Sequence, residues 1–133
     1  MSQDAAIAVP DGPAGLLISR DLFFISKVVG TAQVLGHRII SAGNKALIAA
    51  NLAAWKPVVV FVDLAAGELI SPATLIEFRT ATPGTPFLAF GAHVDTEQLR
   101  LAQQAGCDPV LPRSRFTQEL PDIIRGYFET PVV

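Results

Sequence analysis

The sequence predicts an α/β domain in which one parallel β-sheet lies between two layers of helices. Short apolar runs alternate with longer segments of helical periodicity, and five such pairs follow one another from Leu16 onward. This alternation is typical of parallel strands, which are buried on both faces and joined by helical crossovers. The chain has 133 residues, of which 50% are hydrophobic, and this is enough for one domain with a core on both sides of a sheet.

The first two pairs occupy the chain up to Trp55. The apolar run at 16–19 predicts a strand, and a helix is expected over 21–35, where Gly36 ends it. A second strand is expected at 37–41, followed by an Ala-rich helix that Asn44 opens. The residues expected to share the inward stripe of the first helix are Leu22, Ile25, Val29 and Ala32.

The run VVVFV at 58–62 is the most apolar stretch and is rich in β-branched residues, so we expect it at the centre of the sheet. Ser71 and Pro72 form a helix start, with a capping hydroxyl followed by proline in the first turn. Asp95 is expected to cap the following helix. The remaining elements are expected at 71–81 (helix), 87–90 (strand), 95–106 (helix), 110–111 (strand) and 120–128 (helix).

Composition limits the function classes. Residues 1–15 are rich in Ala, Pro, Gly and Asp, and they predict a mobile tail ahead of a domain over 16–130. The formal charge of -2 gives no basic surface for nucleic acid or an anionic membrane. The single cysteine, Cys107, cannot form an internal disulfide, and no apolar run has the length of a membrane span. The first 15 residues lack the basic and then apolar order of a signal peptide. We therefore expect a cytoplasmic protein.

Chemistry is expected in the loops after the strands, because ligands of such sheets bind beyond the carboxyl ends of the strands. Two acids, Asp21 and Asp63, follow the first and third strands. Where these strands are neighbours, their carboxylates could converge on one hard cation. The other loops carry residues 91–93 and 112–115.

Four segments, LLISRD, VVVFVDL, PFLAFGAH and LAQQAGCDPVL, resemble the receiver domain of bacterial response regulators over residues 16–128. The resemblance implies a flavodoxin-like (βα)5 three-layer sandwich with a parallel five-stranded sheet of order 2-1-3-4-5. It also implies a pocket in which acids after the first strand and an aspartate after the third hold Mg²⁺. In that family the third-strand aspartate accepts a phosphoryl group from a histidine kinase.

Carried over residue by residue, three positions keep the family pattern. Asp63 falls on the phosphoacceptor, Asp21 on the second acid of the pair, and Ala65 on the residue whose backbone carbonyl completes the metal site. Together, Asp21, Asp63 and Ala65 make up a metal site that the resemblance implies.

Four other positions depart from the family pattern. Arg20 falls on the first acid of the pair, and Gly91 on the hydroxyl residue after the fourth strand. Val110 falls on the aromatic switch position, and Arg113 is the nearest match to the lysine after the fifth strand. Because an arginine replaces a metal ligand, we expect weak Mg²⁺ binding and no required cofactor. We further expect Arg20 to bridge Asp21 and Asp63 where the metal would lie.

The resulting hypothesis is an atypical receiver of two-component phosphorelay signalling, with impaired aspartyl phosphorylation and no enzymatic activity. It would act as a protein interaction module, binding a partner or a second copy through the fourth helix, fifth strand and fifth helix. Leu101 and Val110 are the expected contact residues on that face. A histidine kinase is a further candidate partner.

Two alternatives stay open at this point. In the first, the domain is a working Mg²⁺-dependent phosphoacceptor, and Arg113 contacts the phosphoryl group on Asp63. In the second, the same topology holds a flavodoxin-like cofactor-binding domain. The sequence SRDLFF counts against the second, because no glycine-rich phosphate loop follows the first strand.

Overall fold

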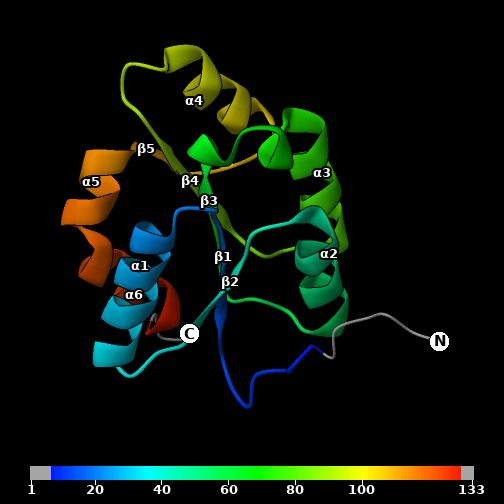
Figure 1. Ribbon diagram of the computed structural model, residues 1–133, viewed down its shortest axis with the longest axis vertical. Coiled ribbons are helices and arrows are strands. Elements are labelled where there is room, and N and C mark those ends of the chain that lie inside the picture. Colours follow the sequence, from blue (N-terminus) through cyan, green and yellow to red (C-terminus); the bar gives the residue numbers. More distant parts are fainter. Residues whose placement is uncertain (1–6, 130–133) are drawn as a thin grey trace.

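The computed structural model describes residues 7–129, which form one parallel sheet between two helical layers (Figure 1). The strand order is β2-β1-β3-β4-β5, and neighbouring strands are parallel throughout. This confirms the predicted fold class and strand order, with the 58–62 run at the centre. The strands are β1 (Gly15–Ile18), β2 (Ile39–Ala42), β3 (Val60–Asp63), β4 (Phe87–Gly91) and β5 (Val110–Pro112).

Helices α1, α5 and α6 cover one face of the sheet, and α2, α3 and α4 cover the other (Figure 1). A 3₁₀ helix, η1, connects β3 to α3. The bounds are α1 (Leu22–Val34), α2 (Lys45–Ala54), η1 (Leu64–Ile70), α3 (Pro72–Ala81), α4 (Thr96–Gln104), α5 (Arg113–Gln118) and α6 (Leu120–Phe128).

Four of the helices begin at a residue whose side chain accepts a backbone N–H of the first turn. Asn44 caps α2, Ser71 caps α3 and Asp95 caps α4, as the sequence predicts. Asp21 does the same for α1. Such caps satisfy N–H groups that lack a partner within the helix, and they typically contribute about 1 kcal/mol each.

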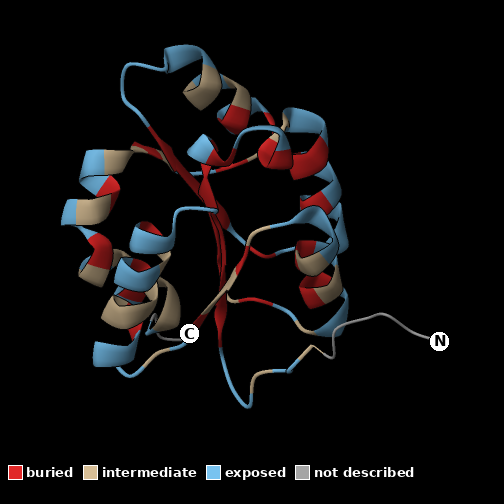
Figure 2. Cartoon of the chain, viewed as in Figure 1, coloured by how far each residue is buried: buried red, intermediate tan, exposed pale blue. Residues whose placement is uncertain are grey.

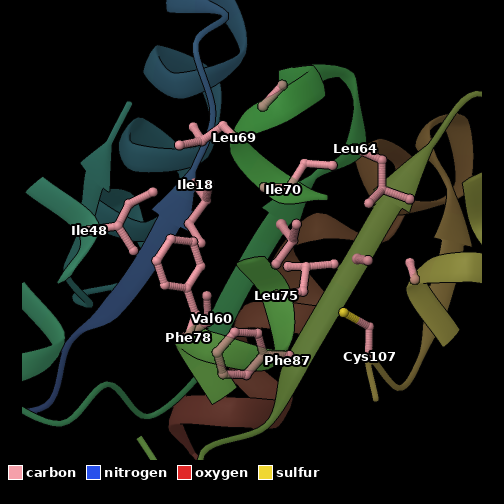
Figure 3. Close-up of a cluster of buried hydrophobic side chains, with 14 of the residues drawn as sticks. Ile18, Ile48, Val60, Leu64, Leu69, Ile70, Leu75, Phe78, Phe87 and Cys107 are labelled. Atoms are coloured by element: carbon pink, nitrogen blue, oxygen red, sulfur yellow. The ribbon is translucent and has the colours of Figure 1, made fainter. Parts of the chain in front are cut away.

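The two core layers follow the alternation of side chains along the strands. Leu17, Phe61 and Phe90 point towards α1, α5 and α6. Ile18 and Val60 point towards α2 and α3, where they join the second core layer (Figure 3). Figure 2 shows the inner strands β1, β3 and β4 buried along their length, as expected for a sheet covered on both sides, whereas the outer strands β2 and β5 are in part half-buried.

Cys107 is fully buried in the second core layer (Figure 3). Burial disfavours the thiolate and raises the pKa of this thiol to about 11. Cys107 is therefore a small apolar core residue and not a reactive thiol at neutral pH.

The predicted stripe of α1 is wrong in part. Phe24, Val28 and Ala32 form its buried face, whereas Leu22 is 79% exposed. The helix opens with four apolar residues in a row, LFFI, so periodicity alone does not select the inward face there.

The predicted tail over 1–15 is also too long. Residues 1–6 lie outside the described residues. Ala14, however, is buried and its carbonyl accepts the N–H of Val58, and Gly15 begins β1. Within residues 7–129, the helices are too short or too polar to span a bilayer.

Candidate functional site

The carboxylate of Asp63 lies at the carboxyl end of the central strand and is almost completely buried, with 2% of its side chain exposed. Three groups donate hydrogen bonds to it. The Ser19 hydroxyl donates to Oδ2 at 2.8 Å, and the Ala65 N–H donates to Oδ1 at 3.0 Å. The Arg113 guanidinium donates to the same Oδ1 at 2.6 Å. Both oxygens of the buried charge are therefore engaged within the domain.

Arg113 supplies the positive charge of this site. It is the first residue of α5, directly after β5, and 31% of its side chain is exposed. Its guanidinium carbon lies 4.6 Å from the centre of the Phe24 ring and 5.5 Å from that of Phe90. The two rings and the carboxylate fix a planar cation from several sides, so Arg113 is held in one orientation.

The carboxylate of Asp21 is engaged at the start of α1. Its carboxylate accepts the N–H of Phe24 as the cap of α1, and the residue is exposed. The Asp21 N–H donates to the Ser19 hydroxyl at 3.2 Å. The backbone of Asp21 is therefore linked to Asp63 through the Ser19 hydroxyl.

The expected role of Arg20 is wrong. Its side chain is exposed, and its Nε donates to the carbonyl of Gly43 at 3.1 Å. Strand alternation explains this, because Leu17 and Ser19 share the α1 face of β1 while Arg20 points towards the α2 face. The cation that meets Asp63 is Arg113, the first residue of α5, much further along the chain.

Replacing Arg20 with alanine should change the free energy of unfolding by less than about 0.5 kcal/mol, because an exposed side chain loses one solvent-accessible hydrogen bond. Urea unfolding of wild type and Arg20→Ala measures this difference. A loss of about 2 kcal/mol or more would mean that Arg20, and not Arg113, balances the charge of Asp63.

Gly91 ends β4 beside the site, and apolar side chains crowd it. A Cβ added there would lie 3.2 Å from the Cβ and Cδ1 of Leu64 and 3.4 Å from Cδ2 of Leu99. The space that a side chain would need at Gly91 is therefore already filled. Val110, at the start of β5, is half-buried and packs against the core layer of α2, α3 and α4.

The predicted contact residue Leu101 is not where the sequence led us to expect it. It lies on the flank of α4 that faces α3 and η1, where it lines a cavity with Leu75 and Ile70. The opposite flank carries Leu99, which packs towards Gly91. The sequence alone does not say on which side of α4 the neighbouring helix lies.

The resemblance to receiver domains implies Mg²⁺ at this position, but the donor set does not fit it. Asp63 is already neutralised by a guanidinium, and Asp21 is turned to the helix cap. Ala65 takes part through its N–H, which donates to Asp63. Among residues 7–129, no three His, Cys, Asp or Glu side chains come together in a way that could hold a metal ion. A dication would have to displace Arg113 from the carboxylate, against the repulsion of like charges.

Sequence reasoning missed Ser19, although a signal was present. Leu17 and Phe61 belong to the same face of neighbouring strands, so the residues two further along, Ser19 and Asp63, also share a face. A hydroxyl next to a buried carboxylate is the expected partner for it.

No family model and no curated protein matches the sequence. The fold is similar to that of several solved structures. A response regulator from Thermotoga maritima has a TM-score of 0.74 and 20% identity, covering 89% of this chain and 98% of that chain. The receiver domain of NtrX from Brucella abortus has a TM-score of 0.75 and 20% identity, covering 88% and 99%. A two-component response regulator from Clostridium difficile has a TM-score of 0.76 and 16% identity, covering 89% and 97%. The chain thus has the fold of receiver domains.

Proposed function

We propose that this chain is a degenerate receiver of two-component phosphorelay signalling, which works by protein contact and not by aspartyl phosphorylation. It has no enzymatic activity, needs no cofactor and acts in the cytoplasm. The observation that carries the proposal is the buried ion pair in which the Arg113 guanidinium donates to Asp63 at 2.6 Å.

Phosphoryl transfer to a carboxylate needs a free oxygen on the nucleophile and positive charge around the transferred group. At Asp63 both oxygens already accept hydrogen bonds, and the nearest cation is bound to the nucleophile itself. A phosphodonor would have to break the ion pair before it could approach. This supports a site in which Asp63 stays paired with Arg113 and is not phosphorylated.

Transmission of a signal from Asp63 is also impaired. A receiver that responds to phosphate moves a hydroxyl towards the phosphoryl group, and Gly91 has none at that position. The gap at Gly91 is filled by the side chain of Leu64, which directly follows Asp63 in the chain. This packing supports a readout surface with one conformation.

We expect no modification of the protein by acetyl phosphate, and no binding of beryllofluoride, in millimolar Mg²⁺. Intact-protein mass spectrometry measures the first, and the amide NMR spectrum measures the second. A functional receiver domain treated in parallel serves as the positive control. A mass increase of one phosphoryl group that disappears in Asp63→Asn would instead make this domain a working phosphoacceptor.

The face formed by α4, β5 and α5 remains our proposed contact for a second copy. Leu101 does not report on this face, because it points towards α3. Gln103 does, since it is exposed and follows Leu99 by one helical turn. If this proposal holds, Gln103→Glu weakens self-association in analytical ultracentrifugation.

A further inference from the structure

A cavity of about 250 Å³ lies between η1, the first turn of α3 and α4, on the side of α4 away from β5. Its walls are mainly apolar. The apolar lining residues are Leu64, Ile70, Pro72, Leu75, Leu101 and Ala102. Figure 3 shows three of them, Leu64, Ile70 and Leu75, which come from η1 and α3.

The size of the cavity indicates what it can hold. Cavities for drug-sized ligands and nucleotides measure roughly 300–1,000 Å³, whereas about 150 Å³ accommodates a benzene ring. A volume of 250 Å³ suits one aromatic or large aliphatic side chain. Such a pocket fits the anchor of a protein interface, where a buried side chain contributes most of the affinity.

The polar part of the lining is acidic. Asp95 and Glu97 lie at the cavity, and Gln98 is the remaining polar lining residue. Arg100 pairs with Glu97 on the exposed surface of α4 at 2.5 Å, which leaves Asp95 as the carboxylate without a cationic partner in this group. A basic residue next to the anchor would complement this charge.

We propose that this cavity is the docking site for a segment of a partner protein that presents one large apolar side chain beside a lysine or arginine. The proposal deepens the role as an interaction module, and it does not depend on whether Asp63 accepts a phosphoryl group. The labelling experiment on Asp63 and the binding experiment below can therefore fail separately.

The cavity shares a wall with the Asp63 site. Leu64 follows Asp63 directly, lines the cavity, and packs against Gly91. Its carbonyl accepts a hydrogen bond from the Gln98 side chain of α4 at 2.6 Å. A bound side chain would thus contact the same residue that closes the switch position, which places the partner next to the family's signalling site.

The test uses three blocked tripeptides, Lys-Phe-Lys, Glu-Phe-Glu and Lys-Ala-Lys, titrated into the full chain and followed by amide NMR. We expect Lys-Phe-Lys to shift the signals of Leu64, Leu75 and Leu101 at millimolar concentration. Glu-Phe-Glu should bind about fivefold more weakly, as expected when exposed attractive pairs become repulsive. Lys-Ala-Lys should not shift these signals, because it lacks the anchor.

Two substitutions on α4 provide matched controls. Leu101→Glu puts a charge in the cavity and should weaken Lys-Phe-Lys binding at least about tenfold, whereas Gln103→Glu adds the same charge on the other flank and should leave it unchanged. Asp95→Asn keeps a good helix cap while it removes the rim charge. Asp95→Asn should weaken the binding of Lys-Phe-Lys about twofold. This variant should remain folded even if the Leu101→Glu variant does not fold.

Equal binding of Lys-Phe-Lys and Lys-Ala-Lys would overturn the proposal, because charge alone would then explain the shifts. Equal binding of Lys-Phe-Lys and Glu-Phe-Glu would mean that the acidic residues at the cavity do not select a basic partner, and the proposed lysine or arginine beside the anchor would be wrong. If the same amides shift when the protein alone is diluted, a second copy fills the cavity, and the proposal of a partner segment is wrong.

Discussion

Replacing Arg113 with methionine should lower the free energy of unfolding by about 2–3 kcal/mol at neutral pH. The substitution keeps a long side chain over the Phe24 ring. It removes the guanidinium charge that pairs with the carboxylate of Asp63, whose side chain is 2% exposed. The buried charge retains only the Ser19 hydroxyl and the Ala65 N–H as donors. Because the Arg113 side chain is itself 31% exposed, water can partly replace it, and the loss stays below that for a fully buried pair.

Urea unfolding of wild type and Arg113→Met at neutral pH, at constant ionic strength, measures this difference.

A double-mutant cycle with Asp63→Asn separates the ion pair from the packing of the arginine. If the pair is responsible, the loss caused by Arg113→Met should fall to about 1 kcal/mol or less in the Asp63→Asn background. Arg113→Lys keeps the charge without the planar stacking and should lie between wild type and methionine. An equal loss in both backgrounds would show that Arg113 stabilises the fold only through its contacts with the rings.

The fold is predictable from this sequence because its local signals agree with one another. Asn44, Ser71 and Asp95 each stand where a helix begins, and Gly36 and Gly106 end helices with φ values of 82° and 101°. The continuous apolar strands need two covering layers, which leaves few architectures. Two elements were missed, the 3₁₀ helix η1 and helix α5, which is 6 residues long and buries one of them, Phe116.

The site is less predictable, because it depends on the direction of single side chains. Near a strand end, a shift of one residue moves a side chain to the opposite face of the sheet. Placing the acid pair at Arg20 and Asp21 overlooked that Ser19, and not Arg20, continues the face of Leu17. The strand pattern itself contained this information.

The role of Arg113 could not be read from local pattern. It reaches Asp63 across 50 positions in the chain, and its orientation depends on Phe24 and Phe90 from two other elements. The sequence offers two arginines for one carboxylate, Arg20 nearby and Arg113 far away. Only the packing of α5 against β4 and β5 decides between them.

Threonine at Gly91 should destabilise the fold by about 1–3 kcal/mol, although threonine is the better residue for a strand. The sign of the change in the free energy of unfolding therefore distinguishes two interpretations of the space beside Gly91. If the space beside Gly91 were open, the β-branched side chain would stabilise β4 by up to about 1 kcal/mol. Because an added Cβ would lie 3.2 Å from two carbons of Leu64, Leu64 must instead shift within a packed core, which costs free energy.

Leu64→Ala should reduce the steric overlap that threonine at position 91 creates. Leu64→Ala alone should cost about 2–5 kcal/mol, because Leu64 is 1% exposed and its loss leaves a cavity. In the double variant the threonine can occupy part of that space, so the combined loss should be smaller than the sum of the two single losses by about 1 kcal/mol or more. Urea unfolding of the four proteins measures the coupling.

Gly91→Val separates the clash from the burial of a hydroxyl, since valine has nearly the shape of threonine without its polar group. If valine and threonine cost the same, steric overlap with Leu64 is responsible. If only threonine is costly, an unpaired hydroxyl is responsible instead. Additive losses in the Leu64→Ala background, for both side chains, would show that Leu64 does not fill the position at Gly91. The proposed closing of the switch would then be wrong, whereas strong coupling means that a single apolar side chain, adjacent to Asp63 in sequence, keeps this site in one state.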